Sequence, residues 1–158
     1  MKNHPTEFKR LNLQGWVVAF FIFFLNFPVS SMIRTWISTG ASTWSTPANW
    51  GGSTPSSGDT AQFSSAFGNC TIDMAITVSR IEILAGYTGV ITLSGGFSIT
   101  VGAGGFSQMS GTFMGGASAI QINGPLQLSG GTFTSTAGNL NIQNSFDVIG
   151  GSFIHNNG

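Results

Sequence analysis

The sequence predicts an all-β fold, a parallel β-helix (β-solenoid) with about 20 residues per coil, preceded by an N-terminal signal helix. Three observations predict it. The second half of the chain repeats itself at a constant interval, short runs of alternating apolar and polar residues are separated by glycines, and an apolar run follows a basic N-terminal stretch. Repeats of this length are typical of stacked architectures, because each repeat buries its apolar face against the next.

Residues 106–158 contain a unit that recurs without a gap, with its second copy beginning at Leu126 and its third at Phe146. Residues of matching type occupy the same place in successive units. These columns are Phe106, Leu126 and Phe146; Gly111, Gly131 and Gly151; Thr112, Thr132 and Ser152; Phe113, Phe133 and Phe153; Ile120 and Leu140; and Ile122 and Ile142. Equivalent residues of stacked coils lie about 4.8 Å apart, so we predict one internal stack of phenylalanines and one of aliphatic side chains.

Upstream of this region the interval is less regular. The step from Leu93 to Phe113 equals the interval of the later repeats, whereas the step from Ile99 to Ile120 is longer by one, which suggests an insertion at a turn. Glycine pairs separate the strand-like runs, and we expect them at corners whose φ angles only glycine adopts without strain. An antiparallel sandwich also uses short strands and glycine turns, but it does not require residues to match at a constant interval.

Residues 1–31 have the features of an export signal. A polar stretch with a basic bias precedes the apolar run from Trp16 to Leu25, and Pro28 and small residues follow it. This order is typical of a signal peptide, which we expect to be cut after Ser31. An uncleaved membrane anchor is the alternative, although the apolar run is only about half as long as a membrane-spanning helix requires.

The chain divides into three predicted parts. A signal peptide occupies residues 1–31, an N-terminal cap segment residues 32–68, and β-solenoid repeats residues 69–158. Because the sequence stops partway through a repeat, we expect a truncated array whose last coil is open. We expect the protein to be secreted or on the cell surface, with membrane contact only through the signal segment.

Composition excludes several classes of protein. Charged residues make up 6% of the chain, but hydrophobic residues make up 41%, including 14 phenylalanines, which is enough to bury a core. Beyond residue 31, two basic residues oppose four acidic ones, a net charge of −2, so no basic stripe exists for nucleic acid. Cys70 is the only cysteine, which excludes an internal disulfide and a multi-cysteine metal site, and we expect it to be buried and unreactive.

Residues 35–63 carry a tryptophan-rich motif, TWISTGASTWSTPANWGGSTPSSGDTAQF. Its distinguishing residues are Trp36, Trp44, the Asn49-Trp50 pair, Pro55, Gly58-Asp59 and Phe63. Followed by a strand-rich solenoid, this segment resembles the opening of extracellular bacterial glycine-rich repeat proteins, including autotransporter-like adhesin passengers. The resemblance covers almost all of the mature chain and implies a parallel β-helix, an architecture that serves as a stalk, an adhesin or an enzyme scaffold.

We assign the tryptophans of this motif to a cap. The first coil of a solenoid has unpaired strand edges and an open apolar end, which something must cover. Trp36, Trp44 and Trp50 are suited to this role. The alternative is a sugar-binding platform, which would need exposed tryptophan faces.

Few residues of the mature chain could support chemistry. The acidic candidates are Asp59, Asp73, Glu82 and Asp147. We expect Asp59 to be a turn residue, and Asp73 or Glu82 to form a solvated ion pair with Arg80. His155 lies near the C-terminus, where a solvated role is expected. We therefore predict no catalytic, cofactor-binding or metal-binding residues, no cofactor, and no enzyme activity.

The expected function is that of a non-catalytic secreted or cell-surface structural or adhesin-like repeat protein. Its expected partners are cell-surface or polysaccharide groups and, through the open C-terminal coil, a second copy of the chain. The alternative is an N-terminal fragment of an extracellular carbohydrate-active enzyme, or a carbohydrate-binding module. An ice-binding solenoid is disfavoured, because Met114 and Ile154 occupy the positions equivalent to Thr134 and interrupt any regular threonine array.

Overall fold

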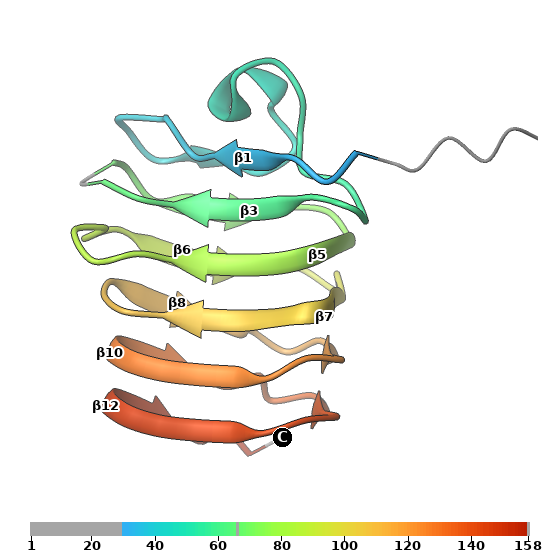
Figure 1. The fold of residues 1–158 in the computed structure, drawn as a ribbon, viewed down its shortest axis with the longest axis vertical. Helices are drawn as coiled ribbons and strands as arrows, with labels where there is room; N and C mark the ends of the chain where they lie inside the picture. Colours follow the sequence, from blue (N-terminus) through green and yellow to red (C-terminus); the bar gives the residue numbers. More distant parts are fainter. Residues whose placement is uncertain (1–29, 66, 158) are drawn as a thin grey trace, which may run out of the picture.

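The protein is described by a computed structural model that covers residues 30–65 and 67–157. One 12-stranded sheet, parallel throughout, winds into a β-solenoid of about four coils of about 21 residues. The predicted fold class is therefore confirmed. Figure 1 shows the coils stacked along the vertical axis, with the C-terminus in the lowest coil. The predicted signal peptide lies almost entirely outside the described residues.

The strand pairs divide the solenoid into three faces. Face A contains β1 (Ile33–Thr35), β3 (Thr60–Phe63), the second parts of β5 (Ile76–Ile83) and β7 (Ile99–Gln108), and the first parts of β10 (Leu126–Thr134) and β12 (Phe146–Ile154). Face B contains β2 (Ser42–Thr43), β4 (Cys70–Ile72), β6 (Val90–Leu93), β8 (Thr112–Met114) and the second parts of β10 and β12. Face C contains the first parts of β5 and β7 with β9 (Ile120–Ile122) and β11 (Leu140–Ile142).

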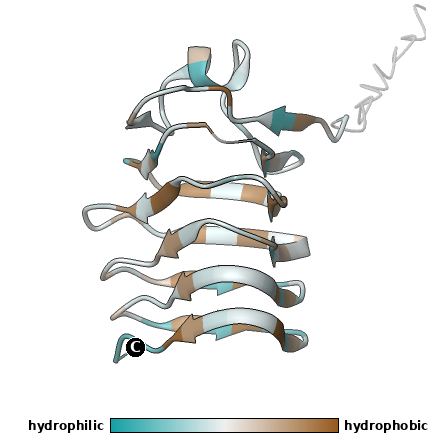
Figure 2. Ribbon diagram, turned by 90° about the vertical axis from the view of Figure 1, so that its left-hand side faces the viewer, coloured by the Kyte–Doolittle hydropathy of each residue, from teal (hydrophilic) through white to brown (hydrophobic). Residues whose placement is uncertain are grey.

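The predicted side-chain stacks are present inside the solenoid. Phe133 pairs in register with Phe113 and Phe153, and the ring centroids lie 4.8 and 5.8 Å apart with nearly parallel planes. Ile142 pairs in the same way with Ile122. Figure 2 shows apolar segments at corresponding places in successive coils, as expected when each coil covers the apolar face of its neighbour.

Upstream of the regular repeats, the predicted alignment of Ile99 with Ile120 is confirmed, but that of Leu93 with Phe113 is wrong by two positions. Phe113 pairs with Ile91 and not with Leu93. The turn that joins β5 to β6 spans residues 84–89 and is longer than the corresponding turn between β7 and β8. Tyr87 of this longer turn is fully buried, so the additional residues contribute to the core.

The three tryptophans close the top of the solenoid. Trp36, Trp44 and Trp50, the last of them in the 3₁₀ helix η1 (Pro47–Trp50), are at most 2% exposed, and all three rings pack against Phe63. The indole N–H of Trp36 donates to the carbonyl of Gly68 at 3.0 Å, and that of Trp50 to the carbonyl of Trp44 at 2.9 Å. This burial favours the cap and removes the alternative of an exposed sugar platform.

Glycine occupies corners that other residues could not fit. Gly111, Gly131 and Gly151 share one column of the repeat and have φ angles of 63°, 72° and 77°. A Cβ on Gly131 would also collide with the carbonyl oxygen of Gly111 in the neighbouring coil. Both the left-handed backbone and the close stacking of coils therefore require glycine in this column. Within the described part of the chain, no helix is long and apolar enough to cross a membrane.

Candidate functional site

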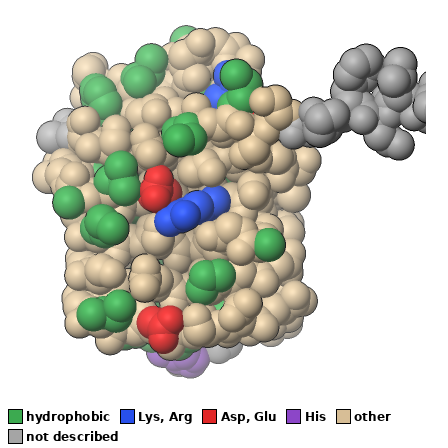
Figure 3. Space-filling model, in the orientation of Figure 1, with side chains coloured by type: hydrophobic (Ala, Val, Ile, Leu, Met, Phe, Trp, Pro, Cys, Tyr) green, Lys and Arg blue, Asp and Glu red, His purple; other side chains and the backbone are tan. Residues whose placement is uncertain are grey.

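Charged side chains are concentrated on face A, which Figure 3 shows. Six charged residues lie within the described ranges, and five of them belong to face A or its edge: Arg34, Asp59, Arg80, Glu82 and Asp147. The sixth, Asp73, follows β4 of face B. Face A is therefore the surface best suited to a polar or charged ligand.

An outward column of polar side chains runs along face A. It consists of Thr35, Gln62, Glu82, Ser107, Gln127 and Asp147. In its upper half, Thr35 donates to Gln62 at 3.3 Å, and Gln62 Nε2 donates to Glu82 Oε2 at 3.0 Å. Arg80 Nη2 then joins Glu82 Oε1 at 3.0 Å and donates to Ser107 Oγ at 3.2 Å. The polar side chains in the upper half of the column are thus bonded to one another and to Arg80.

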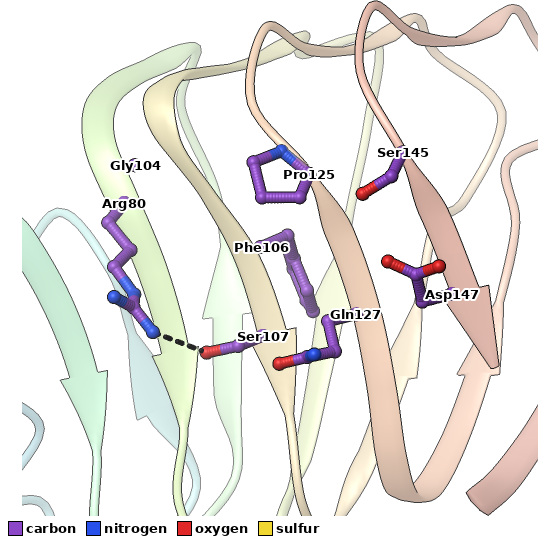
Figure 4. A pocket seen from close by; sticks show the side chains of 8 residues that line it. All are labelled: Arg80, Gly104, Phe106, Ser107, Pro125, Gln127, Ser145 and Asp147. Carbon is purple, nitrogen blue, oxygen red and sulfur yellow. Dashed lines mark hydrogen bonds between the residues drawn. The ribbon is translucent and has the colours of Figure 1, made fainter. Parts of the chain in front are cut away.

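The polar side chains in the lower half of the column remain available to a ligand. Gln127 and Asp147 are exposed, and neither has a hydrogen-bond or ion-pair partner among residues 30–65 and 67–157. Between Arg80 and Asp147 the face has a hollow of about 300 Å³ (Figure 4). It is lined by Arg80, Gly104, Phe106, Ser107, Pro125, Gln127, Ser145 and Asp147.

The hollow exists because glycine follows Arg80 along the stack. Arg80 pairs with Gly105, and the adjacent Gly104 lines the hollow and has no side chain to fill it. Gly105 has a φ of 72°, and a Cβ there would lie 2.7 Å from Pro125 Cδ. A Cβ on Gly104 would lie 2.9 Å from the Cβ of Arg80. Both positions therefore require glycine for conformational and steric reasons.

An insertion in the chain builds the rim of the hollow. Val78 of β5 pairs with Val101 of β7, but Arg80, two positions further along β5, pairs with Gly105, four positions further along β7. Two additional residues are thus accommodated at this corner of one coil, as in a β-bulge. The neighbouring coil packs closely against it, since a Cβ on Gly124 would lie 2.5 Å from the carbonyl oxygen of Ala103.

The electrostatics of the hollow are asymmetric. At one end, the guanidinium of Arg80 is already paired with Glu82, and the two side chains are 40% and 21% exposed. At the other end, the carboxylate of Asp147 is exposed and unpaired within the described ranges. The ion pair expected for Arg80 therefore forms with Glu82. Asp73 is held elsewhere, by the backbone N–H and hydroxyl of Ser45 at 3.0 and 2.7 Å.

Asp59 serves the turn before β3, as predicted. Its carboxylate accepts hydrogen bonds from the backbone N–H and hydroxyl of Ser56 at 2.9 and 2.7 Å and from the backbone N–H of Met32 at 3.1 Å. Arg34 Nε lies 3.8 Å away. Burial would raise the pKa of Asp59, but these hydrogen bonds and the charge of Arg34 together hold the pKa below its usual value.

The remaining candidates for chemistry lie apart from the hollow. Cys70 is fully buried in the core, as predicted, and burial raises the pKa of its thiol. His155 is exposed after the end of β12. Among the residues that the structure describes, no group of three or more histidine, cysteine or acidic side chains could hold a metal ion. The hollow was not predicted from sequence, although the GAGG run of residues 102–105 interrupts the repeat interval at this place.

Face B carries the threonines considered for ice binding. Thr92, Met114, Thr134 and Ile154 pair in register along one outward column. Met114 and Ile154 are 45% and 47% exposed, so they interrupt the column on the outer surface as predicted.

Comparisons with protein-family models, with curated protein sequences and with solved structures found no match.

Proposed function

We propose that this chain is a non-catalytic structural or adhesin-like repeat protein, secreted or held at the cell surface. The observation that carries the proposal is the outward polar column of face A, which continues over six paired strands. A stiff solenoid presents such a column at a regular spacing of about 4.8 Å per coil. Repeated weak polar contacts of this kind suit an extended partner such as a polysaccharide or a cell-surface glycan.

The arrangement of carboxylates on face A favours binding over hydrolysis. Glu82 and Asp147 stand in the same outward column, three coils apart. Three coil spacings amount to about 14 Å. Glycosidases place their two carboxyl groups about 5 to 9.5 Å apart. Glu82 is in addition engaged by Arg80 and Gln62.

Self-association through the open C-terminal coil belongs to the same proposal. Four apolar side chains of β12 are between 43% and 72% exposed: Phe146, Val148, Ile149 and Ile154. Among the strands of the described chain, β12 pairs only with β10, so one edge of its backbone is left for another strand. Exposed strand edges with apolar side chains favour pairing with another chain. The opposite end is covered by the tryptophan cap, so association is directed to the C-terminal coil.

The proposal is tested by adsorption and turnover measured together. The full chain, produced in a bacterial host with its own N-terminal segment, is first located by cell fractionation. The purified protein is then mixed with insoluble polysaccharides, and both sedimentation with the solid and release of reducing ends are measured. We expect export, sedimentation with one or more of the polysaccharides, and no release of sugar. Release of sugar would support the enzyme alternative, and retention in the cytoplasm or absence of binding would refute the proposal.

A second candidate is a carbohydrate-binding module of a larger enzyme. The hollow between Arg80 and Asp147 favours it, because it is a single site and not a repeated one. A module of this kind would bind one oligosaccharide per chain, whereas adhesion through the whole column would bind longer chains more tightly than short ones. Binding measured against oligosaccharides of increasing length separates these two candidates.

A further inference from the structure

The size of the hollow on face A limits what it can hold. Its volume of about 300 Å³ lies at the lower limit for small-molecule sites, which run from about 300 to 1,000 Å³. One sugar ring fits this volume. Because the hollow opens on the surface of face A, the rest of a glycan chain could continue across the neighbouring coils (Figure 4).

The groups around the hollow suit a ligand rich in hydroxyls. Gln127 offers both a donor and an acceptor, and Ser107 and Ser145 offer hydroxyls. The carboxylate of Asp147 is an acceptor with no partner among the described residues. Arg80 is 40% exposed, and its contacts with Glu82 and Ser107 engage only Nη2; because Nε is buried, Nη1 is the group left to donate to a ligand. Both donors and acceptors thus line the space, as sugar hydroxyls require.

The charges around the hollow select among sugars. Glu82 lies 3.0 Å from Arg80 and offsets its positive charge. Asp147 has no such partner within the described ranges, so the local balance of these three groups is negative. A carboxylate on the ligand would be repelled by Asp147, and an ammonium would be attracted to it.

We infer that this hollow binds one unit of a glycan through hydrogen-bond donors of the sugar, with an amino sugar preferred over a neutral one and a uronic acid rejected. The inference rests on the proposed function and names the ligand class of its binding face. An exposed ion pair typically contributes about 0.2 to 1 kcal/mol, so the preference for the amino sugar should be about 1.4- to fivefold in affinity.

The test uses three soluble oligosaccharides of equal length, built from glucosamine, glucose and galacturonate. Their affinities for the full chain are measured by calorimetry at a mildly acidic pH, at which the amines are protonated. The variants are Asp147→Asn and Gln127→Ala. The matched control is Gln121→Ala, which changes the same residue type on an outward position of face C. Circular dichroism confirms that each variant is folded.

The expected pattern is specific. The glucosamine oligomer should bind most tightly and the galacturonate oligomer most weakly. Asp147→Asn should abolish the preference for glucosamine, Gln127→Ala should weaken binding of the glucose and glucosamine oligomers by about two- to tenfold, and Gln121→Ala should change nothing. Equal or tighter binding of galacturonate, or unchanged affinities in the first two variants, would overturn the inference.

The failure of this inference can be told apart from failure of the proposed function. If Asp147→Asn and Gln127→Ala leave the oligomer affinities as in the unsubstituted chain while that chain still sediments with a polysaccharide, the hollow is not the site, and adhesion stands through residues other than these two. If the unsubstituted chain binds none of the three oligomers but sediments with a polysaccharide, the inference again fails alone. If it binds neither soluble nor insoluble sugars, both fail together.

Discussion

The phenylalanine stack offers a direct test of how the solenoid is held together. Phe133 is fully buried, and its ring centroid lies 4.8 Å from Phe113, 5.2 Å from Phe106 and 5.8 Å from Phe153. Replacing a buried phenylalanine by alanine costs about 3 to 5 kcal/mol in the free energy of unfolding. Because the substitution also removes three ring contacts, each worth about 0.5 to 1.5 kcal/mol, we expect Phe133→Ala to fall in the upper half of that range.

The matched control is the same substitution in the last coil that the structure describes. Phe153 is only partly buried and stacks on Phe133 alone within its column. Complete burial of a phenylalanine is worth about 1.5 to 3 kcal/mol, so partial burial should make Phe153→Ala cost about 1 kcal/mol. The measurement is urea unfolding followed by far-ultraviolet circular dichroism, with the free energy taken from the midpoint and slope.

The difference between the unfolding free energies of Phe133→Ala and Phe153→Ala tests whether the rings pack inside the stack. Both remove the same atoms from the same column of the repeat, so only the position along the stack differs. A cost below about 1 kcal/mol for Phe133→Ala would mean that its ring is not packed between its neighbours. Equal costs at Phe133 and Phe153 would contradict the inward stacking of coils on which the fold depends.

Four further outcomes follow from the structure. Gly131→Ala should lose at least about 1 kcal/mol because of its positive φ and the coil packed against it, whereas Gly96→Ala, with open space around it, should leave the urea midpoint nearly unchanged. Because its pKa is lowered by folding, Asp59 stabilises the protein at neutral pH, and this stabilisation is lost as the pH falls through the folded-state pKa. The difference in unfolding free energy between the unsubstituted chain and Asp59→Asn, measured in urea, should therefore disappear in acid. Cys70 should react with thiol reagents only in denaturant, and rapid labelling of the native protein would contradict its burial. Val148→Lys should shift the chain from oligomer to monomer in sedimentation velocity, and a monomeric unsubstituted chain would exclude association through the open coil.

The constant interval of the last three repeats made their register predictable. The pairs Leu126 with Phe106 and Phe133 with Phe113 follow directly from shifting the sequence against itself by one repeat. Strand β6 could not be aligned in this way. Ile91 and Leu93 belong to the same strand and both point inward, so a shift of two positions preserves the alternation of inward and outward side chains. Only the length of the turn before β6 decides whether Phe113 is aligned with Ile91 or with Leu93.

The hollow on face A could not be derived from sequence for a different reason. It depends on residues from four successive coils, which become neighbours only when the register of each coil is known. Arg80 is separated from Asp147 by two intervening strands of face A, and the missing side chain at Gly104 opens the space. The insertion beside Gly105 was visible in the sequence, but its consequence for the outer surface was not.

The position of this hollow has a physical reason in the repeat itself. A perfect solenoid repeat places the same side chains on each coil, so it creates columns and cannot create a unique site. Face B illustrates the regular case, because its outward positions are interrupted only by a change of side chain such as Met114. On face A, the backbone departs from the repeat in β7, where four residues separate Val101 from Phe106 and only three separate the equivalent Ile122 from Leu126 in the next coil. Deleting one of these four residues should restore the interval of the later coils, close the hollow and leave the solenoid folded. If sugar selectivity survives that deletion, specificity resides in the repeated column and not in the irregular coil.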